Sequence, residues 1–334
     1  MVGFTKYKIF SAVVLSLIGA ALLLGALTSA KEDTPVIESE TQPLTAREES
    51  TNILLMGADD EAGLCDVIMI VNLDMAQGRA AVVQIPRDTY AAYTDGSYKK
   101  LNGICNSLGG AKQTAELLER ALGIDIYGYL KIDLDCLGRV VDAVGGIDVD
   151  VPRDMYYSDP EQGLYIRIKK GVNHLDGNSA KGFVRYRAGY VDGDLGRIDA
   201  QKLFMAAFFE RLSQGVSPLT VAELCRALSG TETDISFSSL AEWGYKALDL
   251  KRESITLLTL PGEQAVASVS GASYYALCKR SCAEAVREYL GGVGEFDPEG
   301  IFRNGSYESF INIYEGSSVV KTVTVAELLS RDGV

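Results

Sequence analysis

The chain has 334 residues, with 45 acidic against 32 basic side chains and a formal net charge of −13. Its acidic balance excludes general nucleic-acid binding, which needs an excess of basic side chains, while 47% apolar residues suffice for a substantial core. A single histidine, His174, and six cysteines without a CxxC pair exclude multi-histidine metal sites, zinc ribbons and thioredoxin-type centres, and no disulfide framework is expected.

An uncharged apolar run at residues 9–27 predicts a membrane-spanning helix. At about 1.5 Å per residue, its 19 residues nearly span a hydrocarbon core of roughly 30 Å. Lys6 and Lys8 precede the run, so residues 1–8 are expected in the cytoplasm and the rest of the chain outside. A cleaved signal peptide is the alternative, because residues 28–30 are small, but signal apolar regions are usually shorter. We expect an uncleaved, single-pass anchor in the cell membrane.

Three further regions follow the predicted anchor. Residues 28–50 are rich in Thr, Ser, Glu and Pro, which predicts a flexible extracytoplasmic linker. Residues 51–292 are expected to form one domain. Glycines near position 292 indicate a break, after which residues 293–334 are expected to form a short C-terminal appendage.

Within the domain, short apolar runs alternate with amphipathic segments. Strands are predicted at residues 52–56, 67–73, 80–85, 127–132, 147–151 and 254–260. Helices are predicted at residues 111–122, 134–144, 198–212, 220–228, 239–248 and 274–290. Strands that are apolar on consecutive positions are covered on both faces. The pattern therefore predicts an α/β fold, a three-layer αβα sandwich with a central mixed sheet.

Three arginines and an amide are spaced to meet at one place. If residues 185–187 are extended, Arg185 and Arg187 point to one side and Tyr186 to the other. Arg197 lies near the start of a predicted helix, where a cation is unfavourable unless an anion offsets it. Gln201, one turn later, shares its face. This set predicts binding of phosphate or pyrophosphate, whose oxygens match the guanidinium fork; surface salt bridges are the alternative.

Acidic residues lie next to the predicted strands. Asp59 follows the first strand and Asp66 opens the second, and two such carboxylates near phosphate-binding arginines suit Mg²⁺. The alternative is that Asp60 and Asp66 are ordinary turn residues. Arg87 and Asp88 follow the third strand, and strand ends are where α/β sheets present ligand-binding residues.

The motifs resemble those of a known family. In order from about Asn52 to Leu212 the chain contains NILLMGADD, CDVIMIVNLD, VVQIPRDTY, KKLNGI, LGIDIYGYLKID, VDAVGGIDVDVP, HLDG, VRYR and DLGRIDAQ. This succession is similar to the LytR-CpsA-Psr family of membrane-anchored phosphotransferases of Gram-positive bacteria. Members move a glycan polymer, such as wall teichoic acid or capsular polysaccharide, from an undecaprenyl-pyrophosphate carrier to peptidoglycan. The resemblance implies a Mg²⁺–pyrophosphate site and an apolar channel for the prenyl chain.

The resemblance also implies roles for individual residues. Asp59 and Asp66 match metal-associated aspartates, and Asp88 is expected to orient Arg87. These four residues are the expected catalytic set. The residues expected to bind pyrophosphate or the rest of the substrate are Arg87, Lys100, Asn102, Arg185, Arg187, Arg197 and Gln201.

Two departures leave alternatives open. Leu64 and Ala200 stand where family members often carry arginine, so one cationic contact in the active site is missing. The first hypothesis is a Mg²⁺-dependent transferase that joins the glycan to the wall. The second is a non-catalytic binder or carrier of prenyl-linked glycans, or an envelope regulator of the transcriptional-attenuator kind. A lesser option is hydrolysis of polyprenyl pyrophosphate by water.

Overall fold

The computed structural model describes residues 50–59, 64–92, 98–104, 110–160, 164–190, 194–215, 217–236, 238–240, 242–243, 250–267, 271–292, 310–311 and 319–330. The predicted anchor at residues 9–27 lies outside these ranges. Among the described residues, no helix has the length and apolar character needed to cross a membrane.

A seven-stranded mixed sheet forms the centre of the fold, in the order β11-β6-β1-β2-β3-β12-β16. The inner strand β2 runs antiparallel to its neighbours β1 and β3, whereas β1 pairs parallel with β6 and β3 pairs parallel with β12. Its strands are β1 (Ser50–Asp59), β2 (Leu64–Asp74), β3 (Arg79–Gln84), β6 (Gly128–Asp133), β11 (Glu232–Thr233), β12 (Ile255–Thr259) and β16 (Thr322–Thr324).

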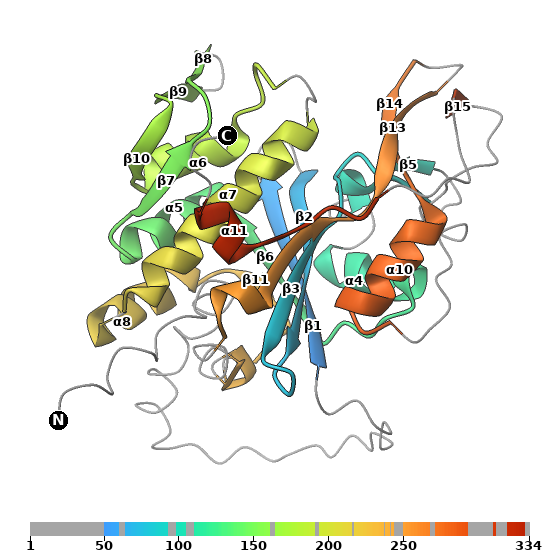
Figure 1. Ribbon diagram of the computed structural model, residues 1–334, viewed down its shortest axis with the longest axis horizontal. Helices are drawn as coiled ribbons and strands as arrows, with labels where there is room; N and C mark the ends of the chain where they lie inside the picture. Colours follow the sequence, from blue (N-terminus) through green and yellow to red (C-terminus); the bar gives the residue numbers. More distant parts are fainter. Residues whose placement is uncertain are drawn as a thin grey trace.

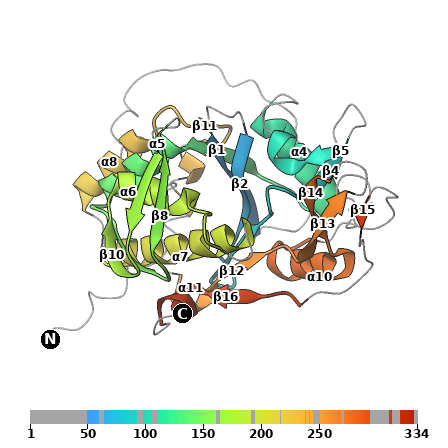
Figure 2. The same cartoon turned by 90° about the horizontal axis from the view of Figure 1, so that it is seen from above.

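Helices cover both faces of this sheet (Figures 1 and 2). One face carries α4 (Ala111–Leu122) and α10 (Lys279–Tyr289). The helices on the other face are α5 (Leu134–Ala143), α6 (Gly177–Arg185), α7 (Asp194–Ser213) and α8 (Pro218–Leu228). The predicted α/β fold with helices above and below a central mixed sheet is confirmed.

Alternation along β1 shows why two helical layers are needed. Ile53 and Leu55 pack into the core shared with α5, α6 and α7, and Leu54 and Met56 pack into the core shared with α4 and α10. Because successive side chains of a strand point to opposite faces, an apolar strand buries itself only when both faces are covered.

Several predicted elements match the structure closely, among them α4 and β7 (Ile147–Val151). The predicted helix at residues 274–290 is wrong in its first part, which forms β14 (Ser273–Leu277) before α10 begins. β14 pairs with β13 (Gly262–Ala267), a partner that helical periodicity does not take into account. The predicted helix at residues 239–248 is described only at residues 238–240 and 242–243, which are helical.

Smaller elements decorate the sandwich. Three two-stranded sheets pair β4 with β5, β7 with β10 and β8 with β9, and β15 adds to β13 and β14. Their bounds are β4 (Tyr90–Ala92), β5 (Tyr98–Lys100), β8 (Met155–Asp159), β9 (Leu164–Ile168), β10 (Gly171–Leu175) and β15 (Phe310–Ile311). Two short 3-10 helices are η1 (Leu101–Gly103) and η2 (Arg252–Ser254).

The described end of the chain joins the central sheet. β16 pairs antiparallel with β12, and α11 (Val325–Leu329) begins with a capping box formed by Thr324 and Glu327. Val325 and Leu328 are buried in the core that contains α7. The segment expected as a C-terminal appendage therefore contributes a strand and a helix to the main body.

Aromatic packing fixes Tyr186 and Tyr190, which follow α6. The Tyr190 ring lies edge-on to Tyr186, with 5.7 Å between centroids, and the Arg153 guanidinium lies 5.2 Å from the Tyr190 centroid. A β-carbon at Gly196 would lie 2.6 Å from Tyr190 Cβ, so only glycine fits beside this ring. Burial raises the pKa of Tyr190 to about 12.

We expect Leu328→Ala to lower the free energy of unfolding by about 2–4 kcal/mol, because it leaves a cavity beneath α11. Val319→Ala, at a side chain that is 81% exposed, is the control and should change it by less than about 0.5 kcal/mol. Urea unfolding of both variants measures the difference. Equal stability of the two variants would mean that the C-terminal segment contributes no core.

We expect Tyr190→Phe to remove an alkaline loss of stability. The pKa of a tyrosine is near 10 in the unfolded chain, whereas burial raises the pKa of folded Tyr190 to about 12. Between these values the unfolded state loses its phenol proton and the folded state keeps it. The wild type should therefore lose stability as pH rises from 10 towards 12, and the variant should lose less. Unfolding free energies measured across this pH range give the slope of stability against pH. Exposed Tyr165→Phe is the control and should show the same slope as the wild type.

Candidate functional site

Asp66 is held by two arginines from different parts of the chain. Asp66 lies in β2, Arg87 follows β3, and Arg197 lies in the first turn of α7. Arg87 Nη1 donates to Asp66 Oδ1 at 2.5 Å, and Arg197 Nη1 lies 3.6 Å from Asp66 Oδ2. Arg197 Nη2 also donates to the Asp66 backbone oxygen at 3.4 Å. One carboxylate thus fixes the position of two guanidiniums.

The Arg197 side chain is only 4% exposed, so its pair with Asp66 is not a surface salt bridge. Burying a guanidinium is costly unless it is paired and hydrogen-bonded. Its position in the first turn of α7 adds the positive end of the helix dipole. Asp66 offsets both effects, which agrees with the expectation that an anion must accompany this arginine.

The arginines surround one polar pocket, here called the arginine pocket. Its charged lining residues are Asp66, Arg87, Arg185, Arg187 and Arg197. The rest of its wall is formed by Leu64, Tyr157, Leu164, Ile166, Tyr186 and Ala188. Four guanidiniums against one carboxylate make the pocket strongly positive within a chain whose net charge is −13. Such a concave cationic site concentrates anions from solution.

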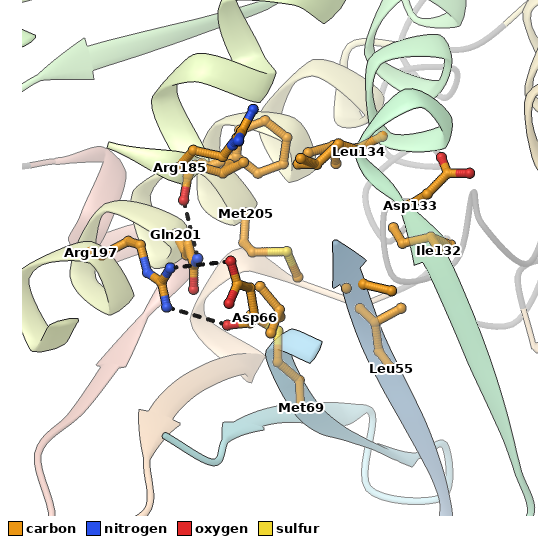
Figure 3. A pocket seen from close by; sticks show the side chains of 16 residues that line it. Leu55, Asp66, Met69, Ile132, Asp133, Leu134, Arg185, Arg197, Gln201 and Met205 are labelled. Carbon is orange, nitrogen blue, oxygen red and sulfur yellow. Dashed lines mark hydrogen bonds and ion pairs between the residues drawn. The ribbon is translucent and has the colours of Figure 1, made fainter. Parts of the chain in front are cut away.

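A second hollow, here called the apolar cavity, lies between the sheet and the helices α5, α6 and α7 (Figure 3). Asp66, Arg185 and Arg197 line both the apolar cavity and the arginine pocket. The cavity holds about 740 Å³ of free space, including its opening to solvent. Its apolar wall comes from Leu55, Met69, Ile132, Leu137, Phe204 and Met205, with Gln201 beside them. The two hollows therefore meet at charged residues.

The segment 185–187 is not uniformly extended. Arg185 is the last residue of α6, and Tyr186, with φ −60° and ψ 127°, takes the chain out of the helix. The expectation of an extended Arg185 is therefore wrong, because α6 continues through it. Arg185, Tyr186 and Arg187 all line the arginine pocket, so the expected division of their side chains onto two sides stays a prediction. Tyr186 is 6% exposed and packs on Tyr190.

Gln201 is tied into the core by a short chain of amides. Gln84 Nε2 donates to Gln201 Oε1 at 2.7 Å, and Gln201 Nε2 donates to the Val184 backbone oxygen at 3.3 Å. Gln84 is 3% exposed; it lies within the VVQIPRDTY motif, but the sequence assigns it no role. Ala200, which stands where family members often carry arginine, is 2% exposed and belongs to the core.

Asp88, Lys100 and Asn102 lie behind Arg87 and line neither hollow. Asp88 Oδ1 is 3.9 Å from Arg87 Nε and 3.0 Å from Lys100 Nζ. The Asn102 backbone N–H donates to the Arg87 oxygen at 3.0 Å. This arrangement agrees with Asp88 as an orienting residue for Arg87, and it places Lys100 and Asn102 as supports of the same turn. Direct substrate contact by these two residues stays a prediction.

The predicted metal ligands are only partly described. The Asp59 backbone ends β1, but its side chain lies outside the described residues. Asp66 lines both hollows and its side chain is 33% exposed. Within the described ranges, no group of three or more histidine, cysteine or acidic side chains could hold a metal. A single carboxylate still fits Mg²⁺ that takes its other oxygens from phosphate and water.

Two features of the site had no signal in the sequence. Cys65, immediately before Asp66, is disulfide-bonded and fully buried. The β8–β9 hairpin supplies Tyr157, Leu164 and Ile166 to the arginine pocket. A lone cysteine and a short tyrosine-rich strand have no sequence pattern that marks them as parts of a binding site.

A family model described as the LytR_cpsA_psr family matches residues 22–289. The Bacillus subtilis (strain 168) polyisoprenyl-teichoic acid–peptidoglycan teichoic acid transferase TagV is 37% identical over 194 residues, 55% of this chain and 49% of TagV. TagU of Oceanobacillus iheyensis, described as the same kind of transferase, is 26% identical over 219 residues, 63% of this chain and 67% of that protein. The chain thus matches about half the length of TagV.

Solved structures agree with these matches. The crystal structure of B. subtilis TagV has a TM-score of 0.63 and 29% identity, covering 74% of this chain and 99% of that one. A structure of TagT bound to LI-WTA shares the fold with a TM-score of 0.60 at 22% identity, covering 74% of this chain and 91% of that one. Because the family model matches most of the chain, the protein belongs to the LytR-CpsA-Psr family.

Proposed function

We propose that this protein is a membrane-anchored, extracytoplasmic phosphotransferase. It moves a glycopolymer from an undecaprenyl-pyrophosphate carrier to peptidoglycan. The relatives TagV and TagU are described as polyisoprenyl-teichoic acid–peptidoglycan teichoic acid transferases, which favours a polymer of the teichoic acid class over capsular polysaccharide. The apolar run at residues 9–27 would hold the domain beside the membrane that contains the lipid carrier.

The observation that carries this proposal is the junction of the two hollows. A prenyl pyrophosphate is apolar at one end and polyanionic at the other. The apolar cavity suits the prenyl chain, the arginine pocket suits the pyrophosphate, and Asp66, Arg185 and Arg197 stand where the two meet. Apolar walls with a few convergent polar groups are typical of small-molecule sites.

The proposed reaction is a phosphoryl transfer. A hydroxyl oxygen of the peptidoglycan sugar attacks the phosphorus that bears the glycan, and the bond from this phosphorus to the prenyl-phosphate oxygen breaks. The products are a phosphodiester between glycan and wall, a prenyl phosphate and a proton. Arg185 and Arg197 lie where the leaving prenyl phosphate gains negative charge, so they favour the transition state. Asp66 and Asp88 keep the arginines in place.

The proposal includes Mg²⁺ because the carboxylate of Asp66 is a suitable ligand for this ion. Asp66, with Asp59, would supply carboxylate oxygens to the ion, and the bound ion would neutralise phosphate charge. In the ligand-free protein Asp66 is engaged by Arg87 and Arg197. Binding of Mg²⁺ and pyrophosphate together would let the arginines exchange this carboxylate for phosphate oxygens.

The metal assignment predicts opposite effects with and without Mg²⁺. Without Mg²⁺, Asp66→Asn should bind inorganic pyrophosphate at least as tightly as the wild type, because a competing carboxylate is removed. With Mg²⁺ present, the wild type should gain affinity and Asp66→Asn should not. Calorimetric titration of pyrophosphate measures both arms.

Asp135→Asn is the control, since Asp135 is 78% exposed and pairs with Lys181 away from the pocket. An Asp66→Asn variant with the same Mg²⁺-dependent gain as the wild type would contradict Asp66 as a ligand.

The arginine assignment predicts loss of binding and of transfer together. A charge-assisted contact to phosphate is worth roughly 1.5–3 kcal/mol, so Arg87→Ala, Arg185→Ala, Arg187→Ala or Arg197→Ala should weaken prenyl-pyrophosphate binding about 10- to 150-fold. Lysine at position 87 or 197 should restore part of it, because the charge remains but the planar fork is lost.

Arg79→Ala is a matched control, because Arg79 pairs with Asp74 at the opposite end of β3. Four variants that fold and bind like the wild type would end the phosphotransferase case. Product analysis with a peptidoglycan acceptor separates the alternatives: a glycan–phosphate–wall product indicates transfer, release of glycan phosphate into water indicates hydrolysis, and retention of intact carrier lipid indicates a binder.

A further inference from the structure

The β8–β9 hairpin contributes to a wall of the arginine pocket that is not shared with the apolar cavity. Tyr157, Leu164 and Ile166 line the pocket but not the cavity, and the exposed Arg187 does the same. The hairpin lies beside α6, whose last residue is Arg185 (Figure 1). This wall is assigned no part in binding the prenyl chain or the pyrophosphate.

Register within the hairpin separates its tyrosines onto two faces. Tyr157 is the cross-strand partner of Ile166, so the two side chains point to the same face. Ile166 is 4% exposed, and a β-carbon at Gly182 of α6 would lie 3.4 Å from it. The face that carries Tyr157 is therefore packed onto α6. Tyr156 and Tyr165 belong to the opposite, solvent-facing side and line neither hollow.

Tyr157 presents free aromatic surface inside the pocket. Two tyrosines line the arginine pocket, and they differ in exposure: Tyr186 is 6% exposed and packs on Tyr190, whereas Tyr157 is 40% exposed. Because Ile166 fixes the hairpin to α6, the position of Tyr157 relative to Arg185 is set by packing. A fixed and partly exposed ring offers a flat apolar surface with a hydroxyl at its edge.

The path of the substrate identifies what meets this ring. In the proposed complex the prenyl chain occupies the apolar cavity and the pyrophosphate lies at the shared residues Asp66, Arg185 and Arg197. The rest of the substrate then continues into the part of the arginine pocket that the cavity does not share. The group attached there is a pyranose ring, which has an apolar C–H face and a polar rim. That pair of surfaces matches an aromatic ring flanked by an exposed arginine.

We propose that Tyr157 is a sugar platform, on which the first pyranose ring of the prenyl-pyrophosphate-linked glycan stacks. Arg187 at the same wall is placed to donate hydrogen bonds to the sugar's hydroxyl oxygens or to the adjacent phosphate. The platform rests on the proposed function and extends it: the arginines hold the pyrophosphate of any such lipid, and Tyr157 distinguishes a lipid that carries a sugar from one that does not.

The test compares two ligands on the full chain in detergent micelles. The probes are geranylgeranyl pyrophosphate and the same lipid with one N-acetylglucosamine on its terminal phosphate. Tyr157→Ala should weaken binding of the glycosylated probe roughly 3- to 10-fold and leave the bare probe within about twofold. Tyr157→Phe should keep most of the affinity, because the stacking surface remains.

Tyr156→Ala and Tyr165→Ala are matched controls, since both remove an exposed tyrosine from the same hairpin without touching the pocket. They should bind both probes as the wild type does. If Tyr157→Ala binds the glycosylated probe like the wild type while Arg197→Ala loses both probes, the platform is wrong and the proposed function survives.

Two further outcomes also overturn the assignment. If the wild type binds neither probe, the proposed function fails and the platform fails with it. If Tyr157→Ala raises KM for a peptidoglycan-fragment acceptor while binding of both probes is unchanged, the ring serves the acceptor sugar and its assignment to the donor is wrong.

Discussion

The architecture of the site depends on one shared carboxylate. Arg197 is almost fully buried at the first turn of a helix, where desolvation and the helix dipole both oppose a cation. Asp66 offsets these costs for Arg197 and at the same time holds Arg87, which arrives from the end of β3. Without this residue, Arg87 and Arg197, which come from elements far apart in the sequence, would lose the carboxylate that they share.

The same arrangement explains how an acidic protein maintains a cationic site. Backbone contacts support the turn that carries Arg87: the Asn102 N–H donates to the Arg87 oxygen, and the Tyr275 N–H donates to the Asp88 oxygen at 2.9 Å. Lys100 pairs with Asp88 behind the pocket and so places its charge away from the pocket wall. The turn that carries Arg87 is thus held by η1 and β14, while Arg185 and Arg197 come from helices α6 and α7.

The sequence predicts what depends on local pattern and misses what depends on remote partners. α4 and β7 follow directly from apolar periodicity and glycine boundaries, and the arginines follow from their motifs. Helical periodicity wrongly predicts a helix at β14, because the pairing of β14 with β13 is a tertiary feature. Gln84 is a polar residue at the end of an apolar strand, and only its amide contact with Gln201 reveals its role. The face on which Tyr157 lies is set by the register of the β8–β9 hairpin, and no sequence motif marks that hairpin.

Charge balance explains how the proposed transfer could proceed without the arginine often found at position 64. Leu64 lies in the wall of the arginine pocket, so the missing cation is a real loss there. The remaining lining residues still carry four positive charges against one negative charge. A pyrophosphate diester brings about one negative charge on each phosphate, and cleavage adds charge to the leaving phosphate. When the pocket carries more positive charge than the bound substrate carries negative charge, the surplus acts mainly on the negative charge that develops during cleavage. It therefore stabilises the transition state more than the ground state. The departure at position 64 therefore reduces the excess without removing it, and a bound Mg²⁺ would enlarge it again.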